Sequence, residues 1–168
     1  MVRPHRHQDA ELRGALIALR ALARRVRALT AEERELRREI QTLVARLAPA
    51  LLDEPGVGPV AAAQVLLSWS HRGRFRSDAA FARLAGAAPI PASSGKRVRH
   101  RLDPGGDRQL NRALHTIVVS PRKHDPTTIA HVERRRAEGK SVREAIRCLK
   151  RYRARRLFRL LEAKPIAA

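Results

Sequence analysis

Apolar residues at the start of the chain repeat with a period of seven. Two rows offset by three residues make up the repeat, and no Pro or Gly interrupts them between Ala15 and Ala48. Alternating spacings of three and four predict one long helix over residues 1–48 that pairs with a partner helix as a coiled coil. An amphipathic helix folded back on its own domain is the alternative. The rows are Leu12, Leu19, Val26, Glu33, Ile40 and Leu47, and Ala15, Leu22, Leu29, Leu36 and Leu43.

Beyond Pro49 the pattern breaks into short amphipathic segments with recognisable start and stop signals. Pro59 at a first helical position predicts a helix that runs to about Trp69, and Ser77 predicts a cap for a helix over 78–84 that Gly86 ends. Residues 87–106 are rich in Pro and Gly, so we expect an exposed loop or a short extended piece there. Trp69 is interpreted as a core residue.

Three further helices are expected in the rest of the chain. Asp107 predicts the cap of a helix with Leu110, Leu114, Ile117 and Val118 on one face, and another helix begins near Thr127 or Thr128 and stops at Gly139. Ser141 and Glu144 form a capping box that opens the last helix. Its expected apolar stripe is Val142, Ile146, Leu149, Leu157 and Leu160. The predicted fold is therefore all-α: a coiled-coil helix over 1–48, a compact helical domain over 49–162 and a tail over 163–168.

Net charge says more about the function of this chain than its overall composition does. The chain of 168 residues carries a formal charge of +20, of which +15 falls in residues 51–168, and all but five of its 36 cations are Arg. So high a charge opposes compaction and calls for a polyanionic partner, of which nucleic acid is favoured because guanidinium groups bind phosphate in a bidentate fork. The sequence has no membrane-spanning stretch and no signal peptide, and Cys148 alone makes no disulfide, so we expect a cytoplasmic, nucleoid-associated protein.

The segment Pro55-Gly56-Val57-Gly58-Pro59 is the first candidate for nucleic-acid binding. Amide groups at a glycine-rich turn before a helix attract phosphate, and glycines let a polynucleotide backbone come close. The segment resembles a helix-hairpin-helix motif, with Gly56 and Gly58 as its two glycines. A plain helical hairpin is the alternative interpretation.

The second candidate is the segment from Ser93 to Arg112, in which two serines and a glycine precede a run of cations. A serine hydroxyl needs a base, a metal or a site of low dielectric before it can attack, and this segment alone supplies none. Standing by itself, Ser93-Ser94-Gly95 is best read as a turn. The cations are candidate phosphate contacts: Lys96, Arg97, Arg99, Arg101, Arg108 and Arg112.

Taken in order, several segments between Leu51 and about Leu161 resemble the carboxy-terminal domain of bacterial transposases of the one-hundred-and-ten insertion-sequence family. The coiled coil before them is also similar to that family. The matching segments are Pro55 to Pro59, Phe75-Arg76-Ser77, Phe81 to Pro89, Ser93-Ser94-Gly95-Lys96, Gly106 to Leu114 and Arg147 to Tyr152.

This resemblance implies RNA-guided DNA recombination by a two-part enzyme. An amino-terminal RNase H-like domain carries four acidic residues that bind Mg²⁺, and the carboxy-terminal domain carries a serine that becomes covalently joined to DNA. That serine precedes a glycine in the family, so it maps onto Ser94, with Ser93 as second choice. The implied partners are DNA and a guide RNA, with self-association through the coiled coil.

The sequence departs from the family pattern in two places. Residues 1–50 offer carboxylates on a heptad helix instead of on strands, so we expect no metal site and no cofactor in this chain, with Mg²⁺ supplied by the RNase H-like domain that is missing. Asp103-Pro104 stands where members carry a polar or basic pair. We therefore expect a truncated copy, or a piece of a longer protein, that is inactive alone.

Three functions follow from these observations. The leading one is a transposase portion that binds DNA and supplies Ser94 as the nucleophile. The second is a helix-hairpin-helix nucleic-acid-binding module without enzymatic activity, acting as a decoy or repressor of a full-length relative. The third is a basic structural protein that packages RNA or associates with ribosomes, in which Ser94 has no role.

Overall fold

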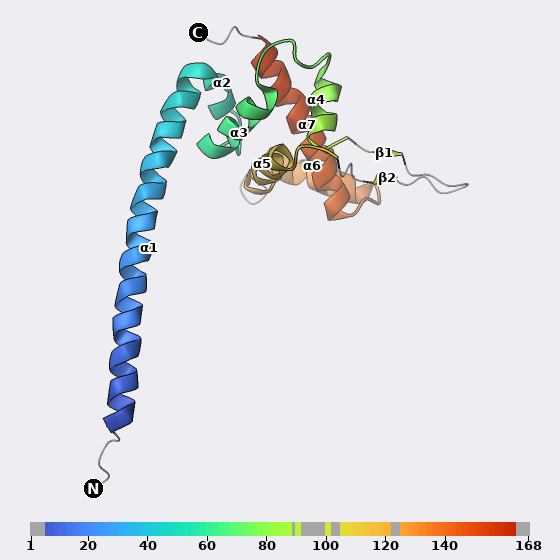
Figure 1. The fold of residues 1–168 in the computed structure, drawn as a ribbon. Coiled ribbons are helices and arrows are strands. Elements are labelled where there is room, and N and C mark those ends of the chain that lie inside the picture. Colours follow the sequence, from blue (N-terminus) through green and yellow to red (C-terminus); the bar gives the residue numbers. More distant parts are fainter. Residues whose placement is uncertain (1–5, 89, 92–99, 102–104, 122–124, 164–168) are drawn as a thin grey trace. The chain divides into compact units, whose positions relative to one another are not determined.

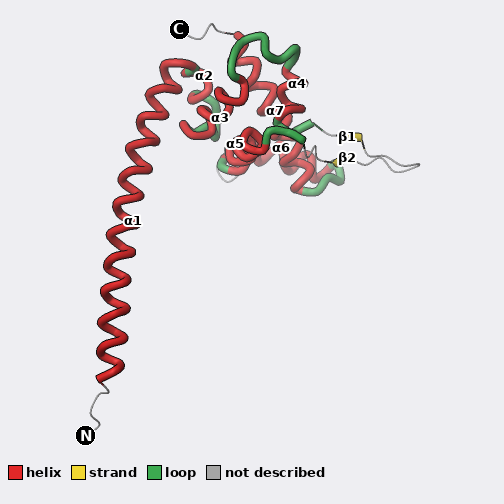
Figure 2. The backbone as a smooth tube through the Cα atoms, viewed as in Figure 1, coloured by secondary structure: helices red, strands yellow, loops and turns green. Residues whose placement is uncertain are grey.

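Seven helices and one pair of two-residue strands make up the part of the chain that can be described (Figures 1 and 2). The computed structural model describes residues 6–88, 90–91, 100–101, 105–121 and 125–163, without the side chains of 6–9, 91, 100 and 101. It divides into two units, residues 1–39 and residues 40–168. None of its helices in these ranges has the run of apolar residues that a membrane crossing requires.

The first unit is the greater part of one helix. Helix α1 spans Arg6–Leu47, 42 residues, which confirms the single long helix that the heptad pattern predicts. Its large apolar side chains stay exposed: Leu22 and Val26, for example, are 62% and 61% exposed. Glu33, the polar member of the seam, pairs with Arg37 on the next turn of the same helix at 2.8 Å.

The second unit begins with the end of α1 and contains the remaining elements. Helix α1 ends at Leu47, and Pro49 is the first residue of α2 (Pro49–Leu52), so the chain bends at the first of the expected breaks. Helices α3 (Pro59–Trp69) and α4 (Asp78–Leu84) have the predicted bounds, and the Ser77 hydroxyl accepts from the Ala80 amide as a helix cap. Gly86, just after α4, has a positive φ of 61°.

The segment after α4 returns on itself through two short strands. Strand β1 (Ile90–Pro91) pairs antiparallel with β2 (His100–Arg101), with Ile90 opposite Arg101 and Pro91 opposite His100. The sequence predicts an exposed loop or a short extended piece here, but it does not predict that two strands pair. The residues joining the strands, 92–99, lie outside the described ranges.

Three helices complete the second unit, each close to its predicted position. Helix α5 spans Arg108–Val119, α6 spans Pro126–Ala137 and α7 spans Val142–Ala163. The predicted capping box is present, because the Ser141 hydroxyl and amide both bond to the Glu144 carboxylate and the Glu144 amide donates back. The start of α6 lies earlier than expected, because Asp125 rather than a threonine caps it.

Helix α7 organises the core of this unit, and the other helices pack around it (Figure 1). It contacts α2, α4, α5 and α6, while α3 lies along α5. Trp69 is buried, as expected, and donates to Glu162 on α7 at 2.9 Å. Three phenylalanine rings meet edge-on or stacked between the start of α4 and α7, with centroids 5.3 to 6.3 Å apart: Phe75, Phe81 and Phe158.

The predicted apolar stripe of α7 is only partly right. Leu149 and Leu157 are buried, but Val142 is exposed, and Ile146 and Leu160 are half-buried. Because α7 is covered by several helices, its buried surface is wider than a single stripe and shifts along its length. The residues that the stripe omitted are Ala145, Lys150, Arg153, Ala154, Phe158 and Leu161.

Candidate nucleic-acid interface

The turn between α2 and α3 places its two glycines in different surroundings. Gly56 has a positive φ of 82°, and a Cβ there would lie 2.5 Å from the carbonyl oxygen of Ile117 and 2.9 Å from the Pro121 ring. Only glycine fits such a backbone conformation at such a close approach. The turn is therefore packed against the end of α5, which is a structural reason for Gly56 that needs no bound nucleic acid.

Gly58, in contrast, faces open space. It is the N-cap of α3, with φ −86° and ψ 167°, and an added Cβ would meet nothing within 4 Å. Gly58 makes no side-chain cap, and Pro59 has no N–H, so the next amides of the first turn are the donors that this helix end can offer. Such an end is favourable for an anion because the helix dipole is positive there.

A buried carboxylate anchors this turn to α7. Glu54, which is 7% exposed, accepts from Arg153 Nη1 at 3.2 Å and from Arg156 Nε at 2.7 and 2.8 Å. The hydrogen bond to Glu54 and its negative charge raise the pKa of Arg156. Removing one partner from a buried ion pair typically costs about 3–5 kcal/mol, because the other charge is left uncompensated. The position of the turn thus depends on two arginines about a hundred residues away in sequence.

The start of α5 is fixed by Asp107. Its carboxylate accepts from the amides of Gln109 and Leu110, both at 2.9 Å, and from the Ser68 hydroxyl at 2.7 Å. Partial burial opposes ionisation of Asp107, but these hydrogen bonds and the charge of Arg74 outweigh it and hold the pKa below its ordinary value. Because Ser68 lies at the end of α3 and Gly56 packs against the end of α5, the two helices run antiparallel.

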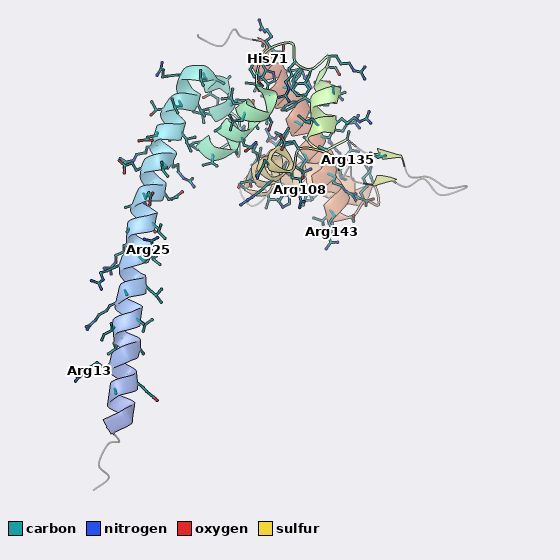
Figure 3. All side chains as sticks on the ribbon, viewed as in Figure 1. Arg13, Arg25, His71, Arg108, Arg135 and Arg143 are labelled. Carbon is teal, nitrogen blue, oxygen red and sulfur yellow. The ribbon has the colours of Figure 1, made fainter. Side chains whose placement is uncertain are left out.

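One face of α5 is basic and exposed. Arg108, Arg112 and His115 follow one another at spacings of four and three, so they share a side of the helix, opposite the buried Leu110, Leu114 and Ile117. Figure 3 labels Arg108 on this helix. The predicted DNA contacts Arg108 and Arg112 are therefore accessible to a partner.

Gly58 and Arg108 lie at opposite ends of the antiparallel α3–α5 pair. A helical rise of 1.5 Å per residue puts Arg108 and Ile117 roughly 14 Å apart along the axis of α5. The two features cannot hold one phosphate group together. A polynucleotide backbone is charged along its whole length and is the kind of anion that can meet both.

The remaining predicted site residues lie outside the described part of the chain. They are Ser93, Ser94, Lys96, Arg97 and Arg99, together with the side chain of Arg101, whose backbone forms β2. The structure describes the two ends of this segment, where it leaves α4 and where it enters α5. The assignment of Ser94, with Ser93 as second choice, stays a prediction.

The described residues do not fit a bound metal ion. Within the ranges that the structure covers, no group of three or more His, Cys, Asp or Glu side chains is close enough to hold one. Most carboxylates of the second unit instead bond to neighbouring arginines, hydroxyls or amides. Asp78, for example, pairs with Arg155 at 3.0 Å and with Arg159 at 3.4 Å.

Sequence reasoning missed the polar contacts that α7 makes inside the fold. In the arginine-rich run from Arg151 to Arg159, Arg153 is buried against Glu54 and three neighbours bind carboxylates. The available signal was Glu54 itself, an acidic residue next to a predicted packed turn. The three neighbours are Arg155, Arg156 and Arg159.

The helix-hairpin-helix motif is not confirmed. A tight turn does join two helices with Gly56 and Gly58 between them, but the first of these helices, α2, has only four residues. The arrangement is a glycine turn that leads into α3, and its role as a hairpin that binds nucleic acid is taken up below as a proposal.

Comparison with known proteins gives a consistent result. A sequence model described as "Transposase IS116/IS110/IS902 family" matches residues 48–133. The chain is 34% identical over 148 residues to "Insertion element IS110 uncharacterized 43.6 kDa protein" of Streptomyces coelicolor, a match that covers 86% of this chain and 36% of the relative. It is 31% identical over 118 residues to "Insertion element IS900 uncharacterized 42 kDa protein" of Mycobacterium paratuberculosis, covering 69% of this chain and 30% of the relative. The chain thus matches about a third of the length of these relatives.

Proposed function

Because the chain belongs to the IS116/IS110/IS902 family of transposases, we propose that it serves DNA transposition by binding DNA and supplying Ser94 as a nucleophile. The DNA contacts are made by the second unit, at the start of α3 and along the exposed face of α5. The turn at Gly56 and Gly58 acts there as a helix-hairpin-helix element. Ser94, in the segment between α4 and α5, is carried beside the bound phosphates.

The exposed basic face of α5 is the observation that carries the DNA-binding part of this proposal. Arg108, Arg112 and His115 stand on one side of a helix whose other side is buried in the core, so the helix is held rigidly with its cations outward. The acidic side chain at the start of this helix, Asp107, is engaged within the fold. Phosphate groups are the partner that such a surface binds through counterion release, with little dependence on base sequence.

The proposed chemical step is a transesterification. The Ser94 hydroxyl oxygen attacks a DNA phosphorus atom and forms a new phosphoester bond, while the bond from phosphorus to one strand oxygen breaks. The serine proton passes to that leaving oxygen, so the products are a serine-linked DNA end and a free hydroxyl end. The number of phosphoester bonds is conserved, and the joined end can be passed to another strand by the reverse reaction.

We further propose that the reaction needs components beyond this chain. Mg²⁺ is held by the RNase H-like domain that the resemblance implies, and no step assigned to this chain involves it. A guide RNA selects the DNA site. Alone, the chain binds DNA but does not cut it.

A complementation experiment tests the role of Ser94. The chain is mixed with the unmatched part of the S. coelicolor relative, Mg²⁺, RNA transcribed from that insertion element and DNA that carries the element's ends. We expect a slowly migrating protein–DNA species on a denaturing gel. It should disappear with Ser94→Ala and persist with the matched control Ser93→Ala, because only one hydroxyl forms the phosphoester bond.

Three results would contradict the proposal. An adduct that survives Ser94→Ala would show that another residue is the nucleophile. Cleavage of DNA by the chain alone would show that it does not depend on the other components. Tight DNA binding without any adduct in the complete mixture would instead favour the non-enzymatic module, a decoy or repressor of a full-length relative.

We also propose that the chain self-associates through the seam of α1. The seam presents a row of exposed Leu and Val side chains over many turns, and a second copy of the same helix offers a matching apolar surface. A dimer would let two DNA-binding units act on two DNA ends at once.

A further inference from the structure

The two ends of the segment between α4 and α5 lie against each other. The chain leaves α4 at Ala85 and returns at Gly106 and Asp107, where α5 begins. The Asp107 amide donates to the Leu84 carbonyl at 2.7 Å. A Cβ on Gly106 would lie 2.7 Å from that same oxygen and 2.9 Å from the Gly86 nitrogen. The two ends are therefore in direct backbone contact.

Asn111, on the first turns of α5, strengthens this junction. Its side-chain nitrogen Nδ2 donates to the Ala85 carbonyl oxygen at 2.6 Å. Its side-chain oxygen Oδ1 accepts from Lys150 Nζ of α7 at 2.5 Å. One amide thus links the exit of α4, the start of α5 and the middle of α7.

Lys150 is buried against a neutral partner. It is 7% exposed, burial lowers its pKa, and within the described part of the chain it donates to the Asn111 amide oxygen. Placing an ammonium group in such a site costs free energy that an apolar side chain would not. A lysine here therefore reduces the stability of the fold relative to an apolar residue such as Met, which points to a role other than core packing.

An ammonium group can do something here that an apolar side chain cannot. It only donates hydrogen bonds, so it selects the orientation of Asn111 in which the oxygen faces Lys150. In that orientation the NH₂ group must face the Ala85 carbonyl. If the amide turned over, two donors would face each other and two acceptors would face each other.

We propose that Lys150 is a positioning residue, which acts through Asn111 to hold the two ends of the segment between α4 and α5. The inference rests on the proposed function in one respect: that segment includes Ser94, so a fixed junction limits where the serine can lie. Fixing a nucleophile relative to its target lowers the entropic part of the barrier.

Hydrogen exchange and global stability together test this proposal without any DNA. In Lys150→Met the side chain stays unbranched and is one atom shorter, and it loses its hydrogen-bond donors. We expect the free energy of unfolding to stay level or rise, because the buried charge is gone, while exchange of the Asp107 amide becomes roughly tenfold faster, the effect of losing about one hydrogen bond. If Lys150 had a merely structural role, its replacement would instead lower the free energy of unfolding, and faster exchange would follow from that loss.

A second variant separates the two bonds of Asn111. In Asn111→Asp the side chain still accepts from Lys150, now as an ion pair, but no longer donates to Ala85. We expect global stability to be retained and the Asp107 amide again to exchange faster. Lys140→Met, which makes the same change at a lysine that pairs with Glu138, is the matched control and should leave the Asp107 amide unchanged.

The proposal is overturned if Asp107 exchange in Lys150→Met changes no more than exchange of the Leu114 amide in the middle of α5. It is also overturned if Asn111→Asp leaves Asp107 protected. Either result stands whether or not Ser94 forms an adduct. Conversely, a wild-type chain that forms no Ser94 adduct would overturn the proposed function and leave the exchange result intact.

Discussion

At the scale of single residues, Gly56 and Gly58 show how one short motif can combine two constraints. Gly56 is required by the fold, because its φ is positive and its Cα lies against the Ile117 carbonyl. Gly58 is not confined by any neighbour, so the fold tolerates a larger side chain there. Such a side chain would still block the approach of a phosphate group to the first amides of α3. Of the two, Gly58 is therefore the position at which a substitution reports on binding without also reporting on folding.

Asp107 gives a prediction about pH. Its pKa is lowered in the folded state, so its contribution to stability is present above the unfolded pKa of about 3.9 and is lost as the pH falls through the folded value. Asp107→Asn keeps the helix cap but removes the charge. We expect the variant to be less stable at neutral pH, by about 1 kcal/mol, since hydrogen bonds to charged groups are the stronger ones.

The difference between wild type and Asp107→Asn is the quantity to follow, by urea unfolding from about pH 7 to about pH 3. We expect this difference to shrink as the pH falls, because Asp107 becomes protonated and loses the advantage of its charge. Other carboxylates such as Asp78 and Glu138 titrate in both proteins and cancel in the subtraction. A difference that stays constant over this range would mean that the charge of Asp107 does not stabilise the fold.

At the scale of elements, the exposed seam of α1 predicts concentration-dependent association. Glu33 occupies a seam position, where a carboxylate weakens pairing while fixing its register. We expect Glu33→Leu to strengthen self-association measured by analytical ultracentrifugation. Glu35→Leu makes the same change at a position outside both rows and is the matched control. A wild-type chain that stays monomeric at high concentration, or two variants that behave alike, would contradict this prediction.

Capping and turn residues made most helices predictable from sequence. Ser77, Asp107 and Ser141 each cap a helix where expected, because a side-chain oxygen beside the first amides is a local interaction. The heptad rows predicted α1 for the same reason, because the seven-residue spacing of a long helix is a local pattern in the sequence.

Features that depend on distant contacts were not predictable in this way. Nothing near Lys150 or Arg153 in sequence indicates that they are buried, because their partners Asn111 and Glu54 come from other helices. The pairing of β1 with β2 likewise joins two separate segments, with Ile90 opposite Arg101. For the candidate site, sequence therefore predicted the exposed cations of α5 but not the contacts that hold the surrounding turns in place.

At the scale of the whole molecule, the distribution of charge is the strongest guide to function. The 36 Lys and Arg side chains are not neutralised evenly by the 16 Asp and Glu side chains, because many of these carboxylates bond within the second unit. Arg153, Arg155 and Arg156 are matched by carboxylates, whereas Arg108 and Arg112 face outward on α5. The molecule thus separates arginines that stabilise the fold from arginines that are available to a polyanion.

The most direct test of the DNA-binding role is the salt dependence of affinity for a short duplex, measured by fluorescence anisotropy. The double variant Arg108→Gln, Arg112→Gln is compared with Arg13→Gln, Arg27→Gln, which removes the same charge from exposed positions outside the seam of α1. Figure 3 labels Arg108 on α5 and Arg13 on α1. We expect the α5 variant to bind more weakly. The slope of log affinity against log salt concentration should become shallower by roughly 1.8, about 0.9 for each lost phosphate contact. The α1 variant should bind almost as the wild type does. Equal losses in the two variants, or an unchanged slope in the α5 variant, would contradict the assignment of α5 as the DNA-binding surface.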